Sequence, residues 1–299
     1  MIERFDVSPA DLLGKGGESE VYALDAARVL RVYRAGARLD YAERRRAFYT
    51  LLQEQHPPFE LPLVLESGTD GDRFYTVERR MCGRAFAGVL SALEGPNRER
   101  ALASYLDVAE QIGTVRFPDL PFGEILTAGD PLRRPSWPQF LWDRLQQTYS
   151  VSRSDVEQDV PDVAAILVHI GAESKVLGNV WEKCLVHGDY FPGNVYIDDA
   201  LQICGVGDFG YTTVIGDPRM DLAGAVVFLE VVDGYHPDDT AFLMRLMEEQ
   251  HGAEMARWID FYRLYYSFYF SGCKADDPRT YAWCIRNLRS WSQAHRGDR

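Results

Sequence analysis

The sequence has few cysteines and no long apolar segment. Its five cysteines are spread along the chain and form no CxxC pair, so neither a disulfide framework nor a zinc knuckle is indicated. The first residues lack the apolar core of a secretory signal. The longest nearly uncharged apolar stretch, residues 223–229, is far too short to cross a bilayer. We therefore expect a protein of the reducing cytoplasm with no membrane partner.

Basic residues are also scarce, because 32 lysines and arginines stand against 45 acidic residues in a chain of 299, a formal net charge of −13. A protein that binds the phosphates of nucleic acids needs a basic face, so this charge argues against nucleic acid as a partner. The acidic excess is compatible with a cationic ligand, but many proteins carry such an excess for solubility alone. Composition leaves both interpretations open.

The remaining composition, 46% hydrophobic and 26% charged residues without repeats or low-complexity tracts, is that of a globular protein with one large or two ordinary domains. The hydrophobic pattern predicts strands at residues 28–33 and 74–78 and a helix at residues 40–55. Beyond them it predicts helices at residues 98–112, 139–149, 160–170 and 258–270, the last one buried, and a hairpin between residues 195 and 206. The expected fold is α+β, with a β-rich lobe of residues 1–80 and a mainly helical lobe of residues 81–299. A cleft between two lobes is the usual place for a ligand.

A glycine cluster lies between the first two apolar stretches, in the segment Leu13-Gly14-Lys15-Gly16-Gly17-Glu18-Ser19. Glycines let backbone N–H groups approach phosphate oxygens closely, so the segment could cover a nucleotide. A glycine-rich hairpin turn explains the same residues equally simply. It is not a Walker loop, because no GK[ST] follows at the required spacing.

Three oxygen-bearing side chains stand near the predicted hairpin. Asp189 precedes Asn194 by five residues on one tight loop, and Asp208 follows the hairpin in the segment Gly207-Asp208-Phe209-Gly210. Asp189 could accept a proton from a hydroxyl group, while Asn194 and Asp208 offer the hard oxygen ligands that suit Mg²⁺. Each carboxylate alone could equally be a turn former or a helix cap. A zinc site at Cys184, His187 and Asp189 is not expected, because no second ligand pair follows at metal spacing.

Taken in order, these segments resemble the protein-kinase-like fold. The runs HGDYFPGN (residues 187–194), GDFG (207–210) and GDPRMDLA (216–223) are more closely similar to the aminoglycoside phosphotransferase family, which includes choline-kinase-like and other small-molecule kinases. The resemblance extends from about residue 10 to about residue 275 and is specific only between residues 186 and 223. It implies a two-lobe α+β fold with a β-rich first lobe and a helical second lobe.

The resemblance also implies roles for individual residues. Asp189 would be the catalytic base, Asn194 and Asp208 the Mg²⁺ ligands, and His187 a brace of the catalytic loop. Asp221 would cap a helix and hold the loop backbone. On the nucleotide side, the resemblance implies contacts with the phosphates and base of ATP or GTP. The residues implied there are Gly14, Lys15, Gly16, Gly17 and Ser19 over the phosphates, with Glu78 to Met81 at the hinge beside the base.

Two departures from the family pattern stand in the first lobe. The strand position that should hold a phosphate-pairing lysine is Arg31, whose planar fork is not equivalent to a compact ammonium, and Lys15 is a possible substitute. The helical glutamate that would pair with it is either Glu43 or Glu54, of which we prefer Glu43. The arginine run at residues 44–46 is interpreted as a solvated helix face.

The expected activity is ATP- or GTP-dependent phosphorylation of a hydroxyl group on a small, cationic molecule, with an aminoglycoside or related antibiotic as the first choice. One alternative is a metabolic kinase for choline, a methylthio-sugar, homoserine or a ketosamine. Another is a catalytically impaired nucleotide-binding module, suggested by the missing strand lysine. Acidic residues of the second lobe would meet the cationic acceptor. The candidates are Asp217, Glu230, Asp233 and Asp260.

Overall fold

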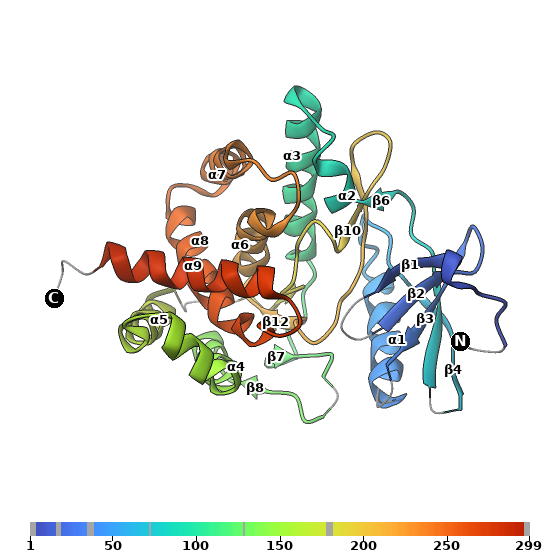
Figure 1. Cartoon of the computed structure of the whole chain (residues 1–299), viewed down its shortest axis with the longest axis horizontal. Coiled ribbons are helices and arrows are strands. Elements are labelled where there is room, and N and C mark those ends of the chain that lie inside the picture. Colours follow the sequence, from blue (N-terminus) through green and yellow to red (C-terminus); the bar gives the residue numbers. More distant parts are fainter. Residues whose placement is uncertain are drawn as a thin grey trace.

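The first part of the chain forms one antiparallel sheet with a helix beside it. The computed structural model describes residues 4–15, 19–34, 39–71, 73–127, 129–177 and 182–295. Figure 1 shows this sheet at one end of the molecule and most helices at the other. The strand order is β1-β2-β3-β5-β4. The elements are η1 (Pro9–Asp11), β1 (Leu12–Lys15), β2 (Ser19–Ala23), β3 (Arg28–Tyr33), α1 (Leu39–Glu54), β4 (Val64–Asp70) and β5 (Arg73–Arg79).

The two faces of this sheet differ because side chains alternate along each strand. Apolar residues of β3 and β5 form a small cluster on one face. Its members are Val7, Leu30, Val32, Tyr75 and Val77. The intervening residues Arg31, Thr76 and Glu78 therefore share the opposite face. The register pairs Arg31 with Thr76 and Val29 with Glu78, so Arg31 and Glu78 are diagonal neighbours on that face.

Helix α1 joins the first lobe to the main core. Its apolar residues Tyr41, Phe48 and Leu52 are all buried, as their common helix face predicts. They belong to the same apolar cluster as residues of the helical lobe, so the core is continuous beneath the sheet. Residues of α1 consequently lie against segments more than 100 positions later in the chain, such as Phe209, which packs on Phe48.

The second part of the chain is mainly helical. Its helices are α2 (Ala87–Leu90), α3 (Gly95–Ile112), α4 (Trp137–Asp159), α5 (Val163–Leu177), α6 (Arg219–Val227), α7 (Pro237–His251), α8 (Glu254–Tyr269) and α9 (Pro278–Ala294), with short 3-10 turns η2 (Phe228–Val231) and η3 (Ser271–Cys273). Helix α8 is buried almost all round, as its apolar sequence predicts, and Tyr266 donates a hydrogen bond to the Met220 carbonyl of α6 at 3.1 Å.

Two small antiparallel sheets hold the loops that carry the sequence motifs. One has the order β8-β7-β12-β9 and the other β11-β10-β6. The strands are β6 (Arg84–Ala85), β7 (Phe122–Glu124), β8 (Arg133–Arg134), β9 (Cys184–Val186), β10 (Val195–Ile197), β11 (Ile203–Val206) and β12 (Val214–Gly216). Residues 187–194 connect β9 to β10, and residues 207–213 connect β11 to β12. Both loops thus start and end on paired strands.

The expected α+β class is confirmed, as are the predicted strands, the hairpin and helix α1. Helix α4 is longer than the predicted 139–149, because its polar second half is held by Ser152, whose hydroxyl lies 2.7 Å from that of Ser271, and by the fully buried Val156. Helix α5 begins later than the predicted residue 160, since Pro161 and Asp162, with φ of 62°, separate it from α4. No helix in the described ranges has the length and apolar character that a transmembrane span requires.

Candidate active site

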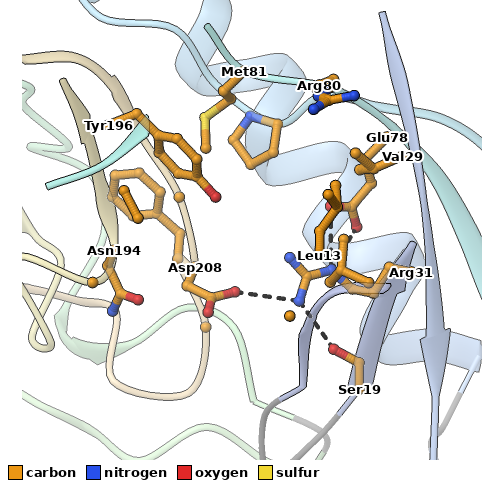
Figure 2. Close-up of a pocket in the computed structure, with 18 of the residues that line it drawn as sticks. Leu13, Ser19, Val29, Arg31, Glu78, Arg80, Met81, Asn194, Tyr196 and Asp208 are labelled. Carbon is orange, nitrogen blue, oxygen red and sulfur yellow. Dashed lines mark hydrogen bonds and ion pairs between the residues drawn. The ribbon is translucent and has the colours of Figure 1, made fainter. Parts of the chain in front are cut away.

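A cleft of about 860 Å³ separates the five-stranded sheet from the two motif loops. Most of the residues singled out from the sequence meet in it, and Figure 2 shows several of them. The singled-out residues that line the cleft are Gly14, Lys15, Ser19, Arg31, Glu78, Met81, Asp189, Asn194 and Asp208. Gly16 and Gly17 lie outside the described residues.

Asp189 and Asn194 form the functional pair of the first loop. The Asn194 side-chain amide donates to the Asp189 backbone carbonyl at 2.9 Å and to its carboxylate at 3.2 Å. Burial and, to a smaller extent, the charge of Asp208 raise the pKa of Asp189 to about 6, against the opposing effect of the Asn194 hydrogen bond. A carboxylate with this pKa is ionised at neutral pH and is a stronger base than an exposed aspartate.

His187 lies beneath this loop and does not line the cleft. Burial lowers its pKa to about 4, so the imidazole is neutral at physiological pH. Its Nε2 lies 2.8 Å from the Gly207 carbonyl and its Nδ1 lies 3.3 Å from the Asp189 amide. Since a carbonyl accepts and an amide donates, these contacts assign the proton to Nε2. His187 thereby connects the first motif loop to the start of the second.

Asp221 fixes the backbone of the same loop from helix α6. Its two carboxylate oxygens accept hydrogen bonds from the His187 amide at 2.6 Å and the Gly188 amide at 2.9 Å. Burial raises the pKa of Asp221 to about 7, although both amides act to lower it. Gly188 has φ of +78°, and a Cβ there would lie 2.2 Å from the Thr212 carbonyl oxygen. Only glycine lets the two loops approach this closely.

Asp208 faces Asn194 across the floor of the cleft. It has φ of 56°, a left-handed conformation that is unfavourable for aspartate and must be held by its surroundings. Its carboxylate oxygen lies 3.4 Å from Arg31 Nη1 and 3.8 Å from Arg45 Nη2. Burial would raise the pKa of Asp208, but the charges of these two arginines outweigh burial and lower it. Asp208 is therefore an ionised, half-exposed ligand group.

Arg31 extends from β3 toward the same space. Its Nε lies 3.1 Å from a carboxylate oxygen of Glu78, and its Nη1 donates to the Ser19 hydroxyl at 3.0 Å (Figure 2). Glu78 is fully buried and also accepts a hydrogen bond from the Thr76 hydroxyl at 2.7 Å. Ser19, which is expected over the phosphates, thus helps to orient the arginine. Contacts with Glu78, Ser19 and Asp208 thus hold the Arg31 guanidinium group, which lines the cleft.

The expected pairing of Arg31 with Glu43 is wrong. Glu43 is exposed on α1 and does not line the cleft, and the carboxylate beside Arg31 comes from Glu78 on β5. Glu78, which is expected at the hinge beside the base, thus meets Arg31 through its side chain. The strand register explains this, because it places Arg31 and Glu78 on one sheet face, whereas Glu43 is exposed on α1.

The arginine run of α1 is also not a uniformly solvated face. Arg44 and Arg46 are exposed, but the Arg45 side chain is only 3% exposed and points inward. It donates to the Tyr33 hydroxyl at 2.8 Å, to Glu78 at 3.1 Å and to the Phe209 carbonyl at 3.3 Å. The sequence signal that could have revealed it is its phase, since it lies four residues after Tyr41 on the apolar face of the helix.

The expected phosphate-covering segment is partly described. Gly14 lines the cleft with open space around it, and Lys15 extends to Glu20, 2.7 Å from its carboxylate, with more than half of its side chain exposed. Lys15 is thus held away from the Arg31 position, and the cation that meets Glu78 and Asp208 is Arg31. The expectation that Lys15 substitutes for a strand lysine has no support in these contacts.

Two side chains with apolar surface, Met81 and Tyr196, line the cleft near the end of β5. Met81 follows β5, and Tyr196 of β10 directs its hydroxyl into the cleft beside it (Figure 2). Gly205 and Gly207 lie close beneath Met81, where an added Cβ would lie 3.2 and 3.1 Å from its side chain. A flat aromatic ring and a thioether are suited to the faces of a planar base. Sequence reasoning missed Tyr196, which looked like an ordinary strand residue.

The oxygen ligands in the cleft fit Mg²⁺. The structure described here contains no group of three or more histidine, cysteine or acidic side chains that could enclose a metal. Mg²⁺ does not need one, since it keeps several waters and binds through one or two protein oxygens plus phosphates. The ionised Asp208 carboxylate and the Asn194 carboxamide oxygen, which lies on the side facing Asp208 in Figure 2, supply such a pair.

The four acidic residues expected to meet a cationic acceptor do not line the cleft. Asp217 is buried and accepts hydrogen bonds from Arg219 at 2.8 Å and Tyr262 at 3.0 Å. Glu230 and Asp233 are likewise engaged by arginines, and Asp260 is exposed on α8. The measured pairs are Glu230–Arg263 at 2.6 Å, Glu230–Arg286 at 3.0 Å and Asp233–Arg279 at 2.7 Å. Asp217, Glu230 and Asp233 are thus engaged by side chains of the helical lobe, and none of the four expected residues faces the cleft.

Besides the contacts of Arg31 and Arg45 with Asp208, an aromatic contact joins the two lobes beside Asp189. The rings of Tyr41 on α1 and Tyr211 in the second motif loop stack with centroids 4.6 Å apart. Nearby, Arg44 donates to the carbonyls of Thr127 at 2.6 Å and Gly129 at 3.0 Å in the segment between β7 and β8. Tyr41 and Tyr211 also line the cleft. The side of the cleft next to Asp189 is thus bounded by residues from both lobes.

Comparison with known proteins agrees with this geometry. A model of the phosphotransferase enzyme family matches residues 11–262. No curated protein sequence matches the chain significantly. Among solved structures, the GDP complex of aminoglycoside 2'-phosphotransferase-IIIa is similar to it with a TM-score of 0.65 and 14% identity, over 95% of this chain and 92% of that one.

Two further structures show the same arrangement. The ADP-bound aminoglycoside phosphotransferase APH(2'')-Ib has a TM-score of 0.61 and 17% identity, over 93% of this chain and 90% of that one. A protein named as a candidate fructosamine-3-kinase from Haemophilus somnus 129PT has a TM-score of 0.60 and 14% identity over the same shares. At these identities the likeness is one of fold: an antiparallel sheet lobe against a helical lobe with the cleft between them.

Proposed function

The chain belongs to the phosphotransferase enzyme family, and from this premise we propose that it transfers the γ-phosphoryl group of ATP to a hydroxyl group of a small molecule. The observation that carries the proposal is the meeting of Asp189, Asp208 and Arg31 in one cleft. These three side chains provide a base, a metal ligand and a phosphate-binding cation. Family members act on hydroxyl groups, which is the chemistry that a buried carboxylate of raised pKa serves.

In the proposed reaction, Asp189 orients the acceptor hydroxyl and takes its proton as the new O–P bond forms and the bond between the γ-phosphorus and ADP breaks. Arg31 binds the phosphates through the edge of its fork that Glu78 does not occupy. Met81 and Tyr196 contact the base. Mg²⁺, held by Asp208 and Asn194, would neutralise phosphate charge. Catalysis of this kind depends mainly on positioning and electrostatics.

We further propose that residues 1–80 form the nucleotide-covering lobe and residues 81–299 the lobe with the catalytic loop and acceptor pocket. The five-stranded sheet ends at Arg79, and the next strand, β6, pairs with β10 of the second part. The hinge would then lie between Glu78 and Met81, beside the expected position of the base.

An aminoglycoside is the first acceptor to test, because the names of several structural neighbours are those of aminoglycoside phosphotransferases. A ketosamine is the second, because one neighbour is named for fructosamine. Both are hydroxylated amines, which agrees with the net charge of −13. The acidic residues of the helical lobe give no separate support, since the three with measured partners are paired with arginines.

The test is a phosphorylation assay with Mg²⁺ and either ATP or GTP. The acceptor panel contains aminoglycosides, other antibiotics, ketosamines, choline, homoserine and a methylthio-sugar, and Asp189→Ala is the matched negative control. Phosphorylation of one panel member by the wild type alone supports the proposal. Absence of any nucleotide-induced thermal shift would overturn it. Nucleotide binding without turnover on the whole panel would favour an impaired binding module, and equal turnover by Asp189→Ala would refute the assigned base.

A further inference from the structure

We propose that Arg45 is a positioning residue that fixes Asp208 for Mg²⁺, so that metal-dependent nucleotide binding relies on a buried cation supplied by helix α1. This inference rests on the proposed function, because it uses Asp208 as the metal ligand. Arg45 lines the inner wall of the cleft with a side chain that is only 3% exposed, and its effect on the metal would pass through Asp208 and the Phe209 carbonyl.

The first reason is the cost of burying this guanidinium. The Arg45 side chain is 3% exposed, and a charge taken out of water is unfavourable unless its donors are satisfied. Here they are: Nη1 donates to Tyr33 and Glu78, Nη2 to the Tyr49 hydroxyl at 3.2 Å, and Nε to the Phe209 carbonyl at 3.3 Å. An apolar residue on this helix face would fill the same space without needing any of these partners.

The second reason is what the contacts connect. Arg45 links α1 to β5 through Glu78, and to the second motif loop through the Phe209 backbone. Its Nη2 is also 3.8 Å from the Asp208 carboxylate. Asp208 has the left-handed φ of 56°, which persists only when neighbouring contacts hold it. Arg45 touches both the side chain of Asp208 and the carbonyl of the next residue, so it restrains the conformation on both sides of that strained position.

The third reason is the charge count. Glu78 lies 3.1 Å from both guanidiniums, and Asp208 lies 3.4 Å from Arg31 and 3.8 Å from Arg45, so two carboxylates meet two guanidiniums. In protein kinases the strand lysine is balanced by a helical glutamate. Here the helix supplies a cation and the balancing acid is on the neighbouring strand. Arg45 supplies the second of the two guanidiniums that meet the Asp208 carboxylate, so removing it leaves Arg31 alone to hold that side chain.

The experiment compares Arg45→Gln and Arg45→Lys with two matched controls. Arg46→Gln removes an exposed cation from the same helix. Arg98→Lys alters another arginine that is mostly buried, paired with Asp239 at 2.5 Å in the helical lobe. Calorimetric titration with ADP, with and without Mg²⁺, measures the enhancement of nucleotide binding by the metal. Hydrogen exchange of the metal-free protein measures how firmly residues 207–213 are held.

We expect Arg45→Gln to lower the Mg²⁺ enhancement of ADP affinity by about tenfold, while metal-free ADP affinity changes less than threefold because Arg31 remains. Arg45→Lys should restore part of the enhancement, since it keeps the charge but cannot make all the hydrogen bonds. The backbone amides of residues 207–213 should exchange hydrogen faster in Arg45→Gln than in the wild type, and their exchange rates should be unchanged in both controls. A purely structural role would lower the melting temperature without altering the metal enhancement.

An unchanged Mg²⁺ enhancement and unchanged exchange in a folded Arg45→Gln protein would overturn the inference and leave the proposed function intact. If Arg45→Gln does not fold, Arg45→Lys provides the test. A Mg²⁺ enhancement of ADP affinity in Arg45→Lys that equals the wild-type enhancement would then overturn the inference. Failure of the wild type to bind any nucleotide would instead overturn the proposed function. The two failures are therefore distinguishable in one set of titrations.

Discussion

In the catalytic loop, groups that act together lie within a few residues of one another, whereas the opposite wall of the cleft is assembled from separate elements. Asp189 and Asn194 are five residues apart and joined by direct hydrogen bonds. The charge network of Arg31, Arg45, Glu78 and Asp208 brings together β3, α1, β5 and the second motif loop. A hydrogen bond beside this network, from the Arg45 side chain to the Phe209 backbone carbonyl, spans 164 positions.

This difference in construction has a physical consequence. A tight loop positions its own side chains through local backbone geometry, so its residue types are strongly constrained. A network between elements requires only that opposite charges meet in space, and any strand or helix at the right distance can supply them. The family pattern is accordingly retained in the catalytic loop, while the first lobe replaces a lysine with Arg31 and moves the acid from the helix to Glu78.

The largest effect is expected from breaking the catalytic loop. Asp189→Asn removes the proton acceptor and keeps the side-chain volume, so kcat should fall by about 10³-fold. Nucleotide affinity should change less than twofold, because Asp189 is not assigned to the phosphates or the base. Steady-state kinetics with the identified acceptor, together with ADP titration, measure both quantities. A loss below tenfold would mean that Asp189 only orients the hydroxyl.

Breaking the charge network should affect stability most. Glu78→Gln removes the carboxylate closest to both guanidiniums and leaves them only the more distant Asp208, so we expect a loss of about 3 kcal/mol in the free energy of unfolding. Burial would raise the pKa of Glu78, but Arg31 and Arg45 outweigh burial and lower it. Its contribution is therefore present above the ordinary pKa of 4.5 and is lost as pH falls through the lower folded value.

Urea denaturation at pH 7 and at pH 4 measures both parts of this prediction. The control is Glu66→Gln, which removes a partly exposed partner of Arg4 and should cost less than about 1 kcal/mol. Equal losses from the two variants would show that the buried network contributes no more than a surface ion pair.

The pH dependence of kcat should show whether Asp189 in the loop between β9 and β10 acts as the base. Asp189 acts when ionised, and its pKa is raised to about 6, so kcat should rise with pH through about 6 and be roughly tenfold lower at pH 5. Replacing Asn194 by serine removes a hydrogen bond that lowers this pKa and should move the acid limb to higher pH. A profile that is flat between pH 5 and 8 would contradict the assignment.

The smallest effect is expected at the contact between the lobes. Arg44→Gln removes the hydrogen bonds to Thr127 and Gly129, which are partly exposed and should stabilise by less than about 1 kcal/mol. We expect KM for the acceptor to rise about threefold and KM for ATP to stay unchanged, because the contact borders the Asp189 side of the cleft. Arg46→Gln is the exposed control on the same helix. A change confined to KM for ATP would place the contact on the nucleotide side.

The fold and the catalytic loop were largely predictable because their signals are local. Strand alternation predicted β3 to the residue, and the spacing of Asp189, Asn194 and Asp208 brought out three residues that line one cleft. Helix α4 was predicted too short, because its second half is stabilised by a distant serine rather than by its own periodicity. Local sequence patterns predict helices, strands and tight loops well, but they do not predict which distant residues a side chain will contact.

The first-lobe network could not be predicted for the same reason. Glu43 and Glu54 share a helix face, and Glu43 is preferred because it is nearer the start of the helix, but neither choice considers that a strand residue beside Arg31 could supply the acid. Arg45 was grouped with Arg44 and Arg46 because three consecutive arginines look solvated, yet a helix turns consecutive side chains 100° apart. Only the register of β3 against β5 shows that Glu78 lies on the face of Arg31.

The arginine at position 31 also determines how this cleft responds to chemical labelling. The chain contains four lysines, at positions 15, 175, 183 and 274, and Lys15 is the one that lines the described cleft. A guanidinium stays protonated and is a poor nucleophile, whereas an ammonium that loses its proton can be acylated. Amine-reactive nucleotide analogues should therefore modify Lys15 at the end of β1 and leave strand β3 untouched, so that a single labelled peptide reports how closely the end of β1 approaches a bound nucleotide.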